Sequence, residues 1–493
     1  MEYQPIRDVY YCRLEALTPV HVGSGETLKR HFDFFILRGR IHLVSQTRLF
    51  SEVEQLGPEK IDEFTKAIAK RGAGAWIEKQ GIPVDKISME SFSLPAGNYP
   101  NEIRAHIRDS FGRPYIPGSS IKGAFRTAII RRLARENKTP IRDGSGNSKI
   151  ADQKVCKALL GQDAKVNLMR ALTVSDFGVE GLEALSHNKA LVYRQEKAGS
   201  GAMDSMKIGK PKHKRQMEIS IEHMPSGTVC SGSISLDRYL VEKDRERSCF
   251  EFKAHLDLVW LITACRKLAQ HTIKTELEFL EDKTGVPVEG IKGFYKDLQE
   301  KQKDLKENEV FFQMAWGAGW RGMTGQLLEI DDLTPETRKK LNLAPKYLDF
   351  PFPKSRRIVT VNGRSRPIGW VKMAFLSREE LRQRAEREEQ DAIIRQQKAE
   401  RQQAEAAALD AAQDLENFQA RVKECKNLPG EIENFIRQVR ARNDRQIRVK
   451  MCRALVAKGA SLGKKNKFSK ALRNGKKWAL GLRNLCDEND VDL

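Results

Sequence analysis

Two serines, a lysine and an arginine follow a turn signal in the segment Tyr115-Ile116-Pro117-Gly118-Ser119-Ser120-Ile121-Lys122-Gly123-Ala124-Phe125-Arg126. Pro117-Gly118 favours a turn, and Ser119 or Ser120 is a suitable N-cap for a following helix. Apolar residues then recur at the spacing of a helix with one buried face. The pattern predicts a helix over residues 119–136.

The start of this helix could bind an anion. Its first turn offers free backbone N–H groups, the positive end of the helix dipole, the hydroxyls of Ser119 and Ser120, and Lys122, with Arg126 one turn later on the same flank. Phosphate is the anion that such a site favours. The alternative is an ordinary serine-capped helix whose lysine extends to solvent.

A histidine and a serine lie in an early glycine-bearing segment, Leu17-Thr18-Pro19-Val20-His21-Val22-Gly23-Ser24-Gly25. Ribonucleases that work without metal use histidine as a general acid or base, so His21 is a candidate for that chemistry. The sequence pairs no second histidine with it. The alternative is a hydrogen-bonding or RNA-contacting residue, with Ser24 beside it.

A second glycine-rich segment is Gly317-Ala318-Gly319-Trp320-Arg321-Gly322-Met323-Thr324-Gly325. It formally matches a dinucleotide fingerprint, but no βαβ unit precedes it and no acidic residue follows at the required distance. Such a loop can still place backbone N–H groups against RNA phosphates, with Arg321 adding charge and Trp320 a stacking face. The alternative is a tight turn before a helix at 323–330.

The elements that must position these residues alternate between strand and helix patterns. Strands are expected at 8–17, 32–37, 40–44, 168–176, 190–194, 310–316, 356–361 and 366–375, and helices at 46–56, 58–80, 102–110, 119–136, 151–160 and 250–281. Residues 216–223 and 228–237 alternate around Pro225-Ser226-Gly227, which favours a hairpin. This mixture predicts an α+β fold with helices on one face of an antiparallel sheet.

Glycines and cations cluster between residues 196 and 216. From residue 207 onward the cations are Lys207, Lys210, Lys212, Lys214 and Arg215. This composition is typical of a loop that folds onto a phosphate backbone, with Lys212, Lys214 and Arg215 as candidate contacts. The alternative is a solvated run of charge.

The composition favours a polyanionic partner. The 493 residues carry 87 Lys and Arg against 66 Asp and Glu, a net charge of +21. Such an excess is relieved by nucleic acid or by an anionic membrane. The sequence shows no long apolar run and no lipidation or secretory signal, which argues against the membrane. The eight scattered cysteines indicate a reduced, cytoplasmic protein without a zinc site; no metal or cofactor is expected.

The last quarter of the chain changes character twice. Residues 377–428 contain no Gly or Pro and predict a helical arm, about 75–80 Å long if continuous. From Glu431 to Arg483 there are 16 Lys or Arg against 3 Asp or Glu, interleaved with Phe435, Phe468 and Trp478. This pattern favours a small helical module that docks nucleic acid or a partner. The alternative is a disordered basic tail.

Four of these segments together resemble a known family. The stretch from Asn101-Glu102-Ile103 through Arg108-Asp109-Ser110-Phe111-Gly112-Arg113-Pro114 into Ile116-Pro117-Gly118-Ser119-Ser120-Ile121-Lys122-Gly123 resembles the signature of the RAMP proteins of type III CRISPR effectors. Residues 17–25, 317–325 and Leu172-Thr173-Val174-Ser175-Asp176 fit the same family in the right order. The resemblance covers roughly residues 8–376 and is greatest to the fifth Csm subunits of type III-A complexes.

The resemblance implies two ferredoxin-like, RNA-recognition-type RAMP domains followed by an all-α C-terminal extension. The expected parts are an N-terminal RAMP domain (1–195), a basic flexible loop (196–216), a C-terminal RAMP domain (217–376), a helical arm (377–428) and a basic helical module (429–493).

The resemblance also implies a function. The chain would be a non-catalytic subunit that binds guide RNA (crRNA), caps its 3′-end side and contributes to complex assembly and 3′-end maturation. Its partners would be crRNA, the backbone RAMP subunit and other Csm subunits, with target RNA and host nucleases as open alternatives. The RNA contacts would include Gly118, Ser119, Ser120, Lys122 and Arg126, then His21, Ser24, Trp320 and Arg321.

Two other functions remain open. Target-slicing relatives carry an aspartate on a loop after the first strand. Here the corresponding stretch is Gly25-Glu26-Thr27-Leu28-Lys29-Arg30, and Asp33 is expected within the next strand. That departure argues against an endoribonuclease, although Glu26 keeps the alternative open. In the other alternative, the C-terminal arm recruits host nucleases.

Overall fold

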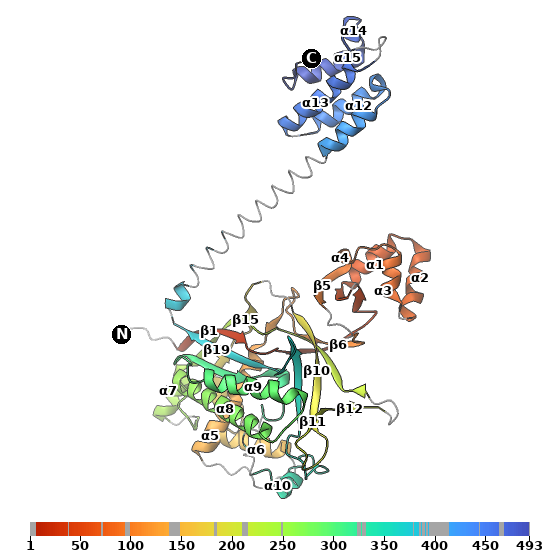
Figure 1. Cartoon of the computed structure of the whole chain (residues 1–493). Coiled ribbons are helices and arrows are strands. Elements are labelled where there is room, and N and C mark those ends of the chain that lie inside the picture. The colour runs from red at the N-terminus through yellow and green to blue at the C-terminus, as the bar shows by residue number, and fades with distance from the viewer. Residues whose placement is uncertain are drawn as a thin grey trace, which may run out of the picture. The chain divides into compact units, whose positions relative to one another are not determined.

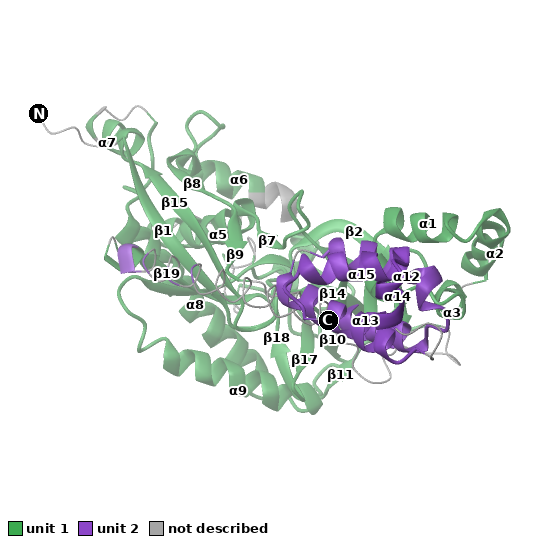
Figure 2. Ribbon diagram, turned by 90° about the horizontal axis from the view of Figure 1, so that it is seen from above, with its two compact units in different colours: residues 1–381 green, residues 382–493 purple. Residues whose placement is uncertain are grey.

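The chain divides into two compact units, residues 1–381 and 382–493 (Figures 1 and 2). Each unit has its own hydrophobic core. The computed structural model describes residues 6–37, 39–70, 72–93, 99–137, 148–181, 185–209, 215–247, 250–322, 327, 332–377, 379–383, 386, 390, 393, 414–442, 444–462 and 468–492. Among the described helices, none combines the length and apolar composition that crossing a membrane requires.

The first large sheet joins the beginning and the end of unit 1. β1 (Arg7–Ala16) lies antiparallel between β15 (Val229–Asp237) and β19 (Trp370–Leu376). The strand order is β16–β19–β1–β15–β9–β7, with β8 paired to β15. The short strands are β7 (Tyr115–Ile116), β8 (Leu172–Val174), β9 (Phe177–Val179) and β16 (Glu309–Gln313). Strands from both predicted RAMP domains therefore share one sheet.

Helices bury one face of this sheet. Along β1, Cys12 and Leu14 are buried while Arg13 between them is exposed, which is the alternation of a half-buried strand. α5 (Gly118–Glu136) and α8 (Leu258–Leu280) contribute to the same core as these strands. α6 (Ser148–Leu160) follows α5 in the chain, and α7 (Arg238–Arg247) follows β15.

The second large sheet has the order β18–β17–β10–β14–β6–β2, with β11 paired to β10. Its pairs are antiparallel except for β14 with β6. α9 (Val286–Lys301) packs its buried Phe294 and Tyr295 in a core with Ile358 of β17. The strands are β2 (Gly23–Lys29), β6 (Glu102–His106), β10 (Ser186–Gln195), β11 (Met203–Ser205), β14 (Glu218–His223), β17 (Ser355–Val361) and β18 (Arg364–Pro367).

A small α/β insertion follows β2. It pairs three strands, β3 (Phe34–Leu37), β4 (Arg40–Val44) and β5 (Ser88–Ser93), and has its own core. Its helices are α1 (Gln46–Glu54), α2 (Pro58–Ala69), α3 (Ala73–Lys79) and α4 (Val84–Ile87). The single helix predicted at 58–80 is two helices: α2 ends at Ala69, and α3 begins after its N-cap, Gly72.

One helix prediction and one hairpin prediction were wrong. The helix predicted at 102–110 is the strand β6, in which Ile103 and Ala105 are buried while Glu102 and Arg104 are exposed. The hairpin predicted at 216–237 does not form, because β14 and β15 belong to different sheets. The intervening Met224 pairs instead with Val20.

Other boundaries shifted. The helix predicted from residue 250 begins at Leu258, because the Asp257 side chain caps it by accepting from the Trp260 backbone N–H at 2.7 Å. The strand predicted at 168–176 is a 3-10 turn, η1 (Leu168–Ala171), followed by β8. The strand predicted at 310–316 ends at Gln313, before the 3-10 turn η3 (Ala315–Gly317). The helix predicted at 323–330 lies almost entirely outside the described residues.

The predicted basic loop contains regular structure. β11 pairs with β10, and β12 (Lys207–Ile208) pairs with β13 (Arg215–Gln216). Lys210, Lys212 and Lys214 lie outside the described residues.

Unit 2 contains a helical module. Its helices are α12 (Leu428–Arg440), α13 (Arg445–Ala460), α14 (Phe468–Arg473) and α15 (Lys477–Asp487), and their apolar residues form one core. α12 is capped by the side chain of Asn427, which accepts from the Gly430 backbone N–H. Most of the arm predicted at 377–428 lies outside the described residues.

Candidate nucleic-acid interface

The fold brings the early histidine loop to the end of β16 and to β6. The backbone N–H of Trp316 donates to the carbonyl of His21 at 3.3 Å. The backbone N–H of Val22 donates to Nδ1 of His106 at 3.2 Å. Three segments that are far apart in the sequence therefore meet at one place.

The other predicted segments join the same region through α5. The backbone N–H of Gly118 donates to Oδ1 of Asp176 at 2.8 Å, and the hydroxyl of Thr127 lies 3.3 Å from the carbonyl oxygen of Gly322. Hydrogen bonds thus link three of the segments that carry the family resemblance directly, and the late glycine loop is linked to them through Thr127 of α5.

The N-terminus of α5 differs from the prediction. The helix begins at Gly118 with Pro117 at the N-cap, and no side chain caps it from that position, so the prediction of Ser119 or Ser120 as N-cap was wrong. A Cβ on Gly118 would lie 2.3 Å from the carbonyl oxygen of Val174. The close approach of α5 to β8 leaves room only for glycine, and the carboxylate of Asp176 already serves the positive end of the helix.

The polar residues of α5 have different surroundings. Ser119 is exposed and Ser120 is half-buried. Lys122 is half-buried, and burial lowers its pKa. Arg126 donates to Sγ of Cys156 on α6 at 2.9 Å. Phosphate binding by these residues stays a prediction.

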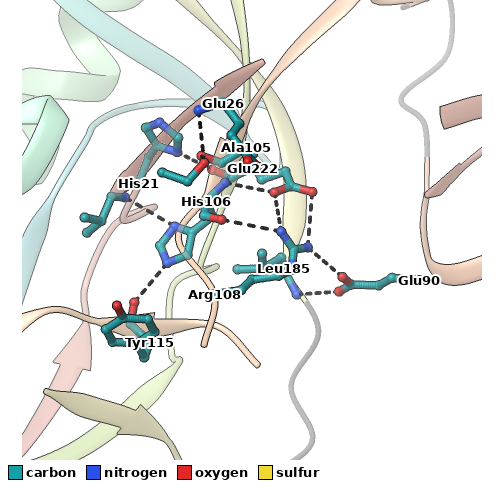
Figure 3. Close-up of polar contacts among 11 residues, drawn as sticks. His21, Glu26, Glu90, Ala105, His106, Arg108, Tyr115, Leu185 and Glu222 are labelled. Atoms are coloured by element: carbon teal, nitrogen blue, oxygen red, sulfur yellow. Dashed lines mark hydrogen bonds and ion pairs between the residues drawn. The ribbon is translucent and has the colours of Figure 1, made fainter. Parts of the chain in front are cut away.

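His21 is part of a buried network that spans the second sheet (Figure 3). It is 1% exposed, and its Nδ1 lies 2.6 Å from the carbonyl oxygen of Glu222. Burial lowers the pKa of His21, and the bond to Glu222 opposes that effect. A histidine so enclosed keeps its ring away from a substrate at the surface, and it is suited to hold the early loop against β14.

The same network contains an arginine between two glutamates. Arg108 donates from Nη1 to Glu222 Oε2 at 2.7 Å and from Nη2 to Glu90 Oε2 at 2.7 Å (Figure 3). The backbone N–H of His106 donates to Glu222 Oε2 at 2.9 Å. Burial lowers the pKa of Arg108, but the two glutamates outweigh it and the net shift is upward. Arg108 is therefore committed to joining β5, β6 and β14.

Two arginines that were not identified in the sequence flank Trp316. The guanidinium carbon of Arg357 lies 4.3 Å from the centre of the Trp316 ring, and that of Arg104 lies 5.6 Å from it. Arg357 also donates to the carbonyl of Trp316 at 3.0 Å. Burial lowers the pKa of Arg357, and the nearby charge of Arg104 lowers it further.

These two arginines have no acidic partner among the described residues. Both are exposed residues of the second sheet, and within the part of the chain that the structure describes neither forms an ion pair. Their charges repel, so an anion bound next to both guanidinium groups would be stabilised. We call Arg104, Trp316 and Arg357 the arginine–tryptophan cluster. Strand pairing through β10 and β14 brings Arg104 and Arg357 together, and Trp316 joins them from η3, so no local sequence pattern marks the cluster.

The late glycine loop is more enclosed than predicted. The Trp320 ring packs edge-on against Phe352, with ring centres 4.8 Å apart. Arg321 is 7% exposed and lines a cavity of about 660 Å³ together with Arg338 and Arg356. Arg338 is committed to backbone carbonyls, including that of Tyr347 at 2.7 Å. Contact of Trp320 and Arg321 with RNA stays a prediction.

The remaining predicted contacts are peripheral. Ser24 is exposed at the start of β2, where its hydroxyl accepts from the backbone N–H of Glu26 at 3.2 Å. Arg215 pairs with Ile208 in the β12–β13 ladder. Lys212 and Lys214 lie outside the described residues.

The acidic candidates for nuclease chemistry are also placed. Asp33 is not within a strand as predicted but in the turn before β3, where Oδ2 accepts from the backbone N–H of Lys29 at 2.8 Å. Glu26 is exposed on β2. Within the described residues no group of three or more His, Cys, Asp or Glu side chains is placed to hold a metal ion.

Comparisons with known proteins agree with the sequence resemblance. A model of the RAMP superfamily matches residues 13–404. The CRISPR protein Csm5 of Methanocaldococcus jannaschii is 26% identical over 420 residues, which cover 76% of this chain and 93% of that protein. Csm5 of Streptococcus thermophilus is 28% identical over 144 residues, which cover 25% of this chain and 38% of that protein.

Solved structures share the fold. A chain of the Csm–crRNA–target RNA ternary complex of a type III-A system matches with a TM-score of 0.54 at 22% identity, over 74% of this chain and all (100%) of that one. The crystal structure of T. onnurineus Csm5 matches with a TM-score of 0.50 at 21% identity, over 73% of this chain and 99% of that one.

Proposed function

The chain belongs to the RAMP superfamily and is a homologue of Csm5, and we propose from this that it is a guide-RNA-binding subunit of a type III-A CRISPR effector complex. In this proposal it binds crRNA, docks against the backbone RAMP subunit and caps the 3′-end side of the guide. It thereby contributes to assembly and to 3′-end maturation in the cytoplasm. The matching chain in a Csm–crRNA–target RNA complex supports these partners.

The arginine–tryptophan cluster is the observation that carries the proposal. Arg104 and Arg357 present two guanidinium groups beside a half-buried indole ring, without a carboxylate partner in the described part of the chain. Guanidinium groups recognise phosphate, and a tryptophan between them gives an aromatic surface near the backbone. This chemistry suits binding by phosphate contacts with little reading of base identity.

We propose that the subunit is not a nuclease. Its candidate general base, His21, is buried and held to Glu222, and Asp33 caps a turn. His21 and Asp33 therefore have structural roles in the fold. Glu26, which kept the nuclease alternative open, is exposed, and no group of three or more His, Cys, Asp or Glu that could hold a metal ion is found in the described residues. The finer fold assignment, two ferredoxin-like domains that contribute strands to shared sheets, forms part of the same proposal.

The RNA interface can be tested with a double substitution. We expect Arg104→Gln with Arg357→Gln to weaken binding of single-stranded RNA and to lower the slope of log K against log salt by about 0.7 per lost phosphate contact. The measurement is fluorescence anisotropy over a salt series. Lys301→Gln with Lys303→Gln is the matched control, because both lysines are exposed and already paired with Asp297 and Glu300. An unchanged slope in the arginine variant would reject this interface.

The role in the complex needs a separate experiment. The tagged chain is purified from its native cell and the ends of co-purifying RNA are sequenced. Short RNAs with a shared repeat-derived 5′ tag and stepped 3′ ends are expected for a crRNA-binding subunit. A broad mixture without a shared tag would contradict the proposal and reduce the homology to a shared fold.

A further inference from the structure

The helical module of unit 2 uses its aromatic residues for packing. Phe435, Phe468 and Trp478 are at most 9% exposed and belong to the core of the module. The rings of Phe468 and Trp478 lie 5.9 Å apart and join α14 to α15. The sequence had suggested these aromatic residues as part of a docking surface, and that interpretation was wrong. A ligand that binds the surface of the module therefore cannot stack on these three aromatic rings.

Acidic side chains neutralise one end of the module. Arg440 donates from Nε to Glu488 at 3.0 Å, and Arg445 pairs with Asp490. Arg448 donates to Oδ1 of Asn489 at 3.0 Å. These contacts join the end of α12 and the beginning of α13 to the residues that follow α15. The charges of Arg440 and Arg445 are therefore compensated, while Arg448 is held by a neutral amide.

From the middle of α13 onward, Lys477 and Arg483 are paired with Glu433 and Asp487, but other exposed cations have no acidic partner in the described residues. Within the described residues 414–442, 444–462 and 468–492 no ion pair is formed by five of them, Lys450, Arg453, Lys470, Arg473 and Lys476. We call these five residues the basic set. Lys450 and Arg453 are three residues apart on α13, as are Lys470 and Arg473 on α14, so each pair shares one helix face.

We propose that the basic set binds the phosphate backbone of RNA, independently of sequence and without base stacking. Five like charges on one small module repel one another, and a polyanion relieves that repulsion. Acidic protein surfaces are the other common polyanions. Protein interfaces, however, rely on apolar or aromatic anchors, and Leu480 is the only large apolar side chain exposed in the described part of the module. Phosphate contacts need no such anchor.

The RNA contacts of this module are distinct from those of the arginine–tryptophan cluster. The superfamily match ends at residue 404, before the module begins. A chain with both surfaces would hold RNA at the RAMP unit and at a second, electrostatic site. The second site therefore does not depend on the role proposed for the first.

The test neutralises the basic set in the full chain. We expect the variant with Lys450→Gln, Arg453→Gln, Lys470→Gln, Arg473→Gln and Lys476→Gln to bind a labelled, mixed-sequence single-stranded RNA more weakly. The slope of log K against log salt should fall by about 0.7 per lost contact, or about 3.5 if all five contribute. Circular dichroism on heating checks that the variant keeps its helices.

Matched controls separate local from overall charge. The chain with Lys60, Lys86, Lys274, Lys301 and Lys303 changed to Gln loses the same charge from residues of unit 1 that are already paired, and should keep the parent slope. A charge-retaining variant, with Lys450, Lys470 and Lys476 changed to Arg, should also keep it. An unchanged slope in the neutralised variant, or an equal loss in the lysine control, would overturn the proposal. Either result leaves the test of Arg104 and Arg357 unaffected.

Discussion

At the scale of single residues, Gly118 shows how a motif residue is fixed by packing. The sequence placed it in a phosphate-binding turn, and the structure places it where α5 touches the backbone of β8. Its backbone N–H is used by Asp176, which lies 58 residues away in the sequence. A glycine at this position is required by the approach of two elements, whatever the helix N-terminus binds.

This leads to a prediction about stability. Gly118→Ala should lower the free energy of unfolding by about 1–3 kcal/mol or more, because its Cβ would meet the carbonyl oxygens of Val174 and Ser175. Gly123→Ala is the control: this glycine lies in the same helix, is exposed and has open space around it. It should stabilise by about 0.5–1 kcal/mol through helix propensity. Urea unfolding of both variants measures these changes. Equal effects of the two substitutions would contradict the close approach of α5 to β8 at Gly118.

At the scale of elements, the second sheet buries three histidines that lie on three of its strands. His106 of β6, His187 of β10 and His223 of β14 are each at most 3% exposed. Burial lowers the pKa of His106 to about 3 and the pKa values of His187 and His223 to about 4. These strands therefore pair around imidazoles that are neutral in the folded protein.

The three buried histidines predict a loss of folding stability in acid. In the unfolded chain these histidines bind a proton near pH 6.5, and in the folded chain only near pH 3 to 4. Because the unfolded state binds more protons between these limits, folding stability is complete above about pH 6.5 and falls as the pH drops towards 4. The slope approaches about 1.4 kcal/mol per pH unit for each such histidine.

Unfolding free energies measured from pH 8 to pH 4 test this. His187→Gln should flatten the profile, because His187 has no hydrogen-bond partner for either ring nitrogen in the described structure and little else is lost with it. The control substitution is His255→Gln, because His255 is exposed; it should leave the profile unchanged. A parent protein whose unfolding free energy does not change between pH 6.5 and pH 4 would contradict the burial of these histidines in their neutral form.

At the scale of the whole molecule, the chain contains two units with separate cores. The core of unit 2 is formed by residues between Phe418 and Val491, and the cores of the large sheets by residues before Leu381. Each unit buries enough apolar surface to fold as a cooperative body. Substitutions in one core should therefore leave the other unit's stability unchanged.

Calorimetry can show this independence. Leu455→Ala removes a fully buried side chain from the module and should cost about 2–5 kcal/mol in the transition of unit 2 alone. Ile129→Ala, the corresponding change in α5, should move only the transition of unit 1. A single transition shifted by both substitutions would mean that the units unfold together.

The sequence by itself determined much about this protein. Local signals placed α5 within one residue of its true start, identified the strands at residues 40–44 and 356–361, and predicted a basic helical region at the C-terminus. The four motifs identified the superfamily that the comparison with known proteins confirmed. These features depend on residues that are close together in the chain, so that composition and spacing are enough to reveal them.

Only the tertiary structure decided the rest. It turned the predicted hairpin into strands of two different sheets, placed the aromatic residues of the module in its core, and gave the N-terminus of α5 to Asp176. It also joined Arg104 and Arg357 around Trp316 through the register of four strands. The physical reason is the same in each case: which groups meet across a sheet or inside a core depends on long-range pairing and burial, and local sequence patterns do not encode these.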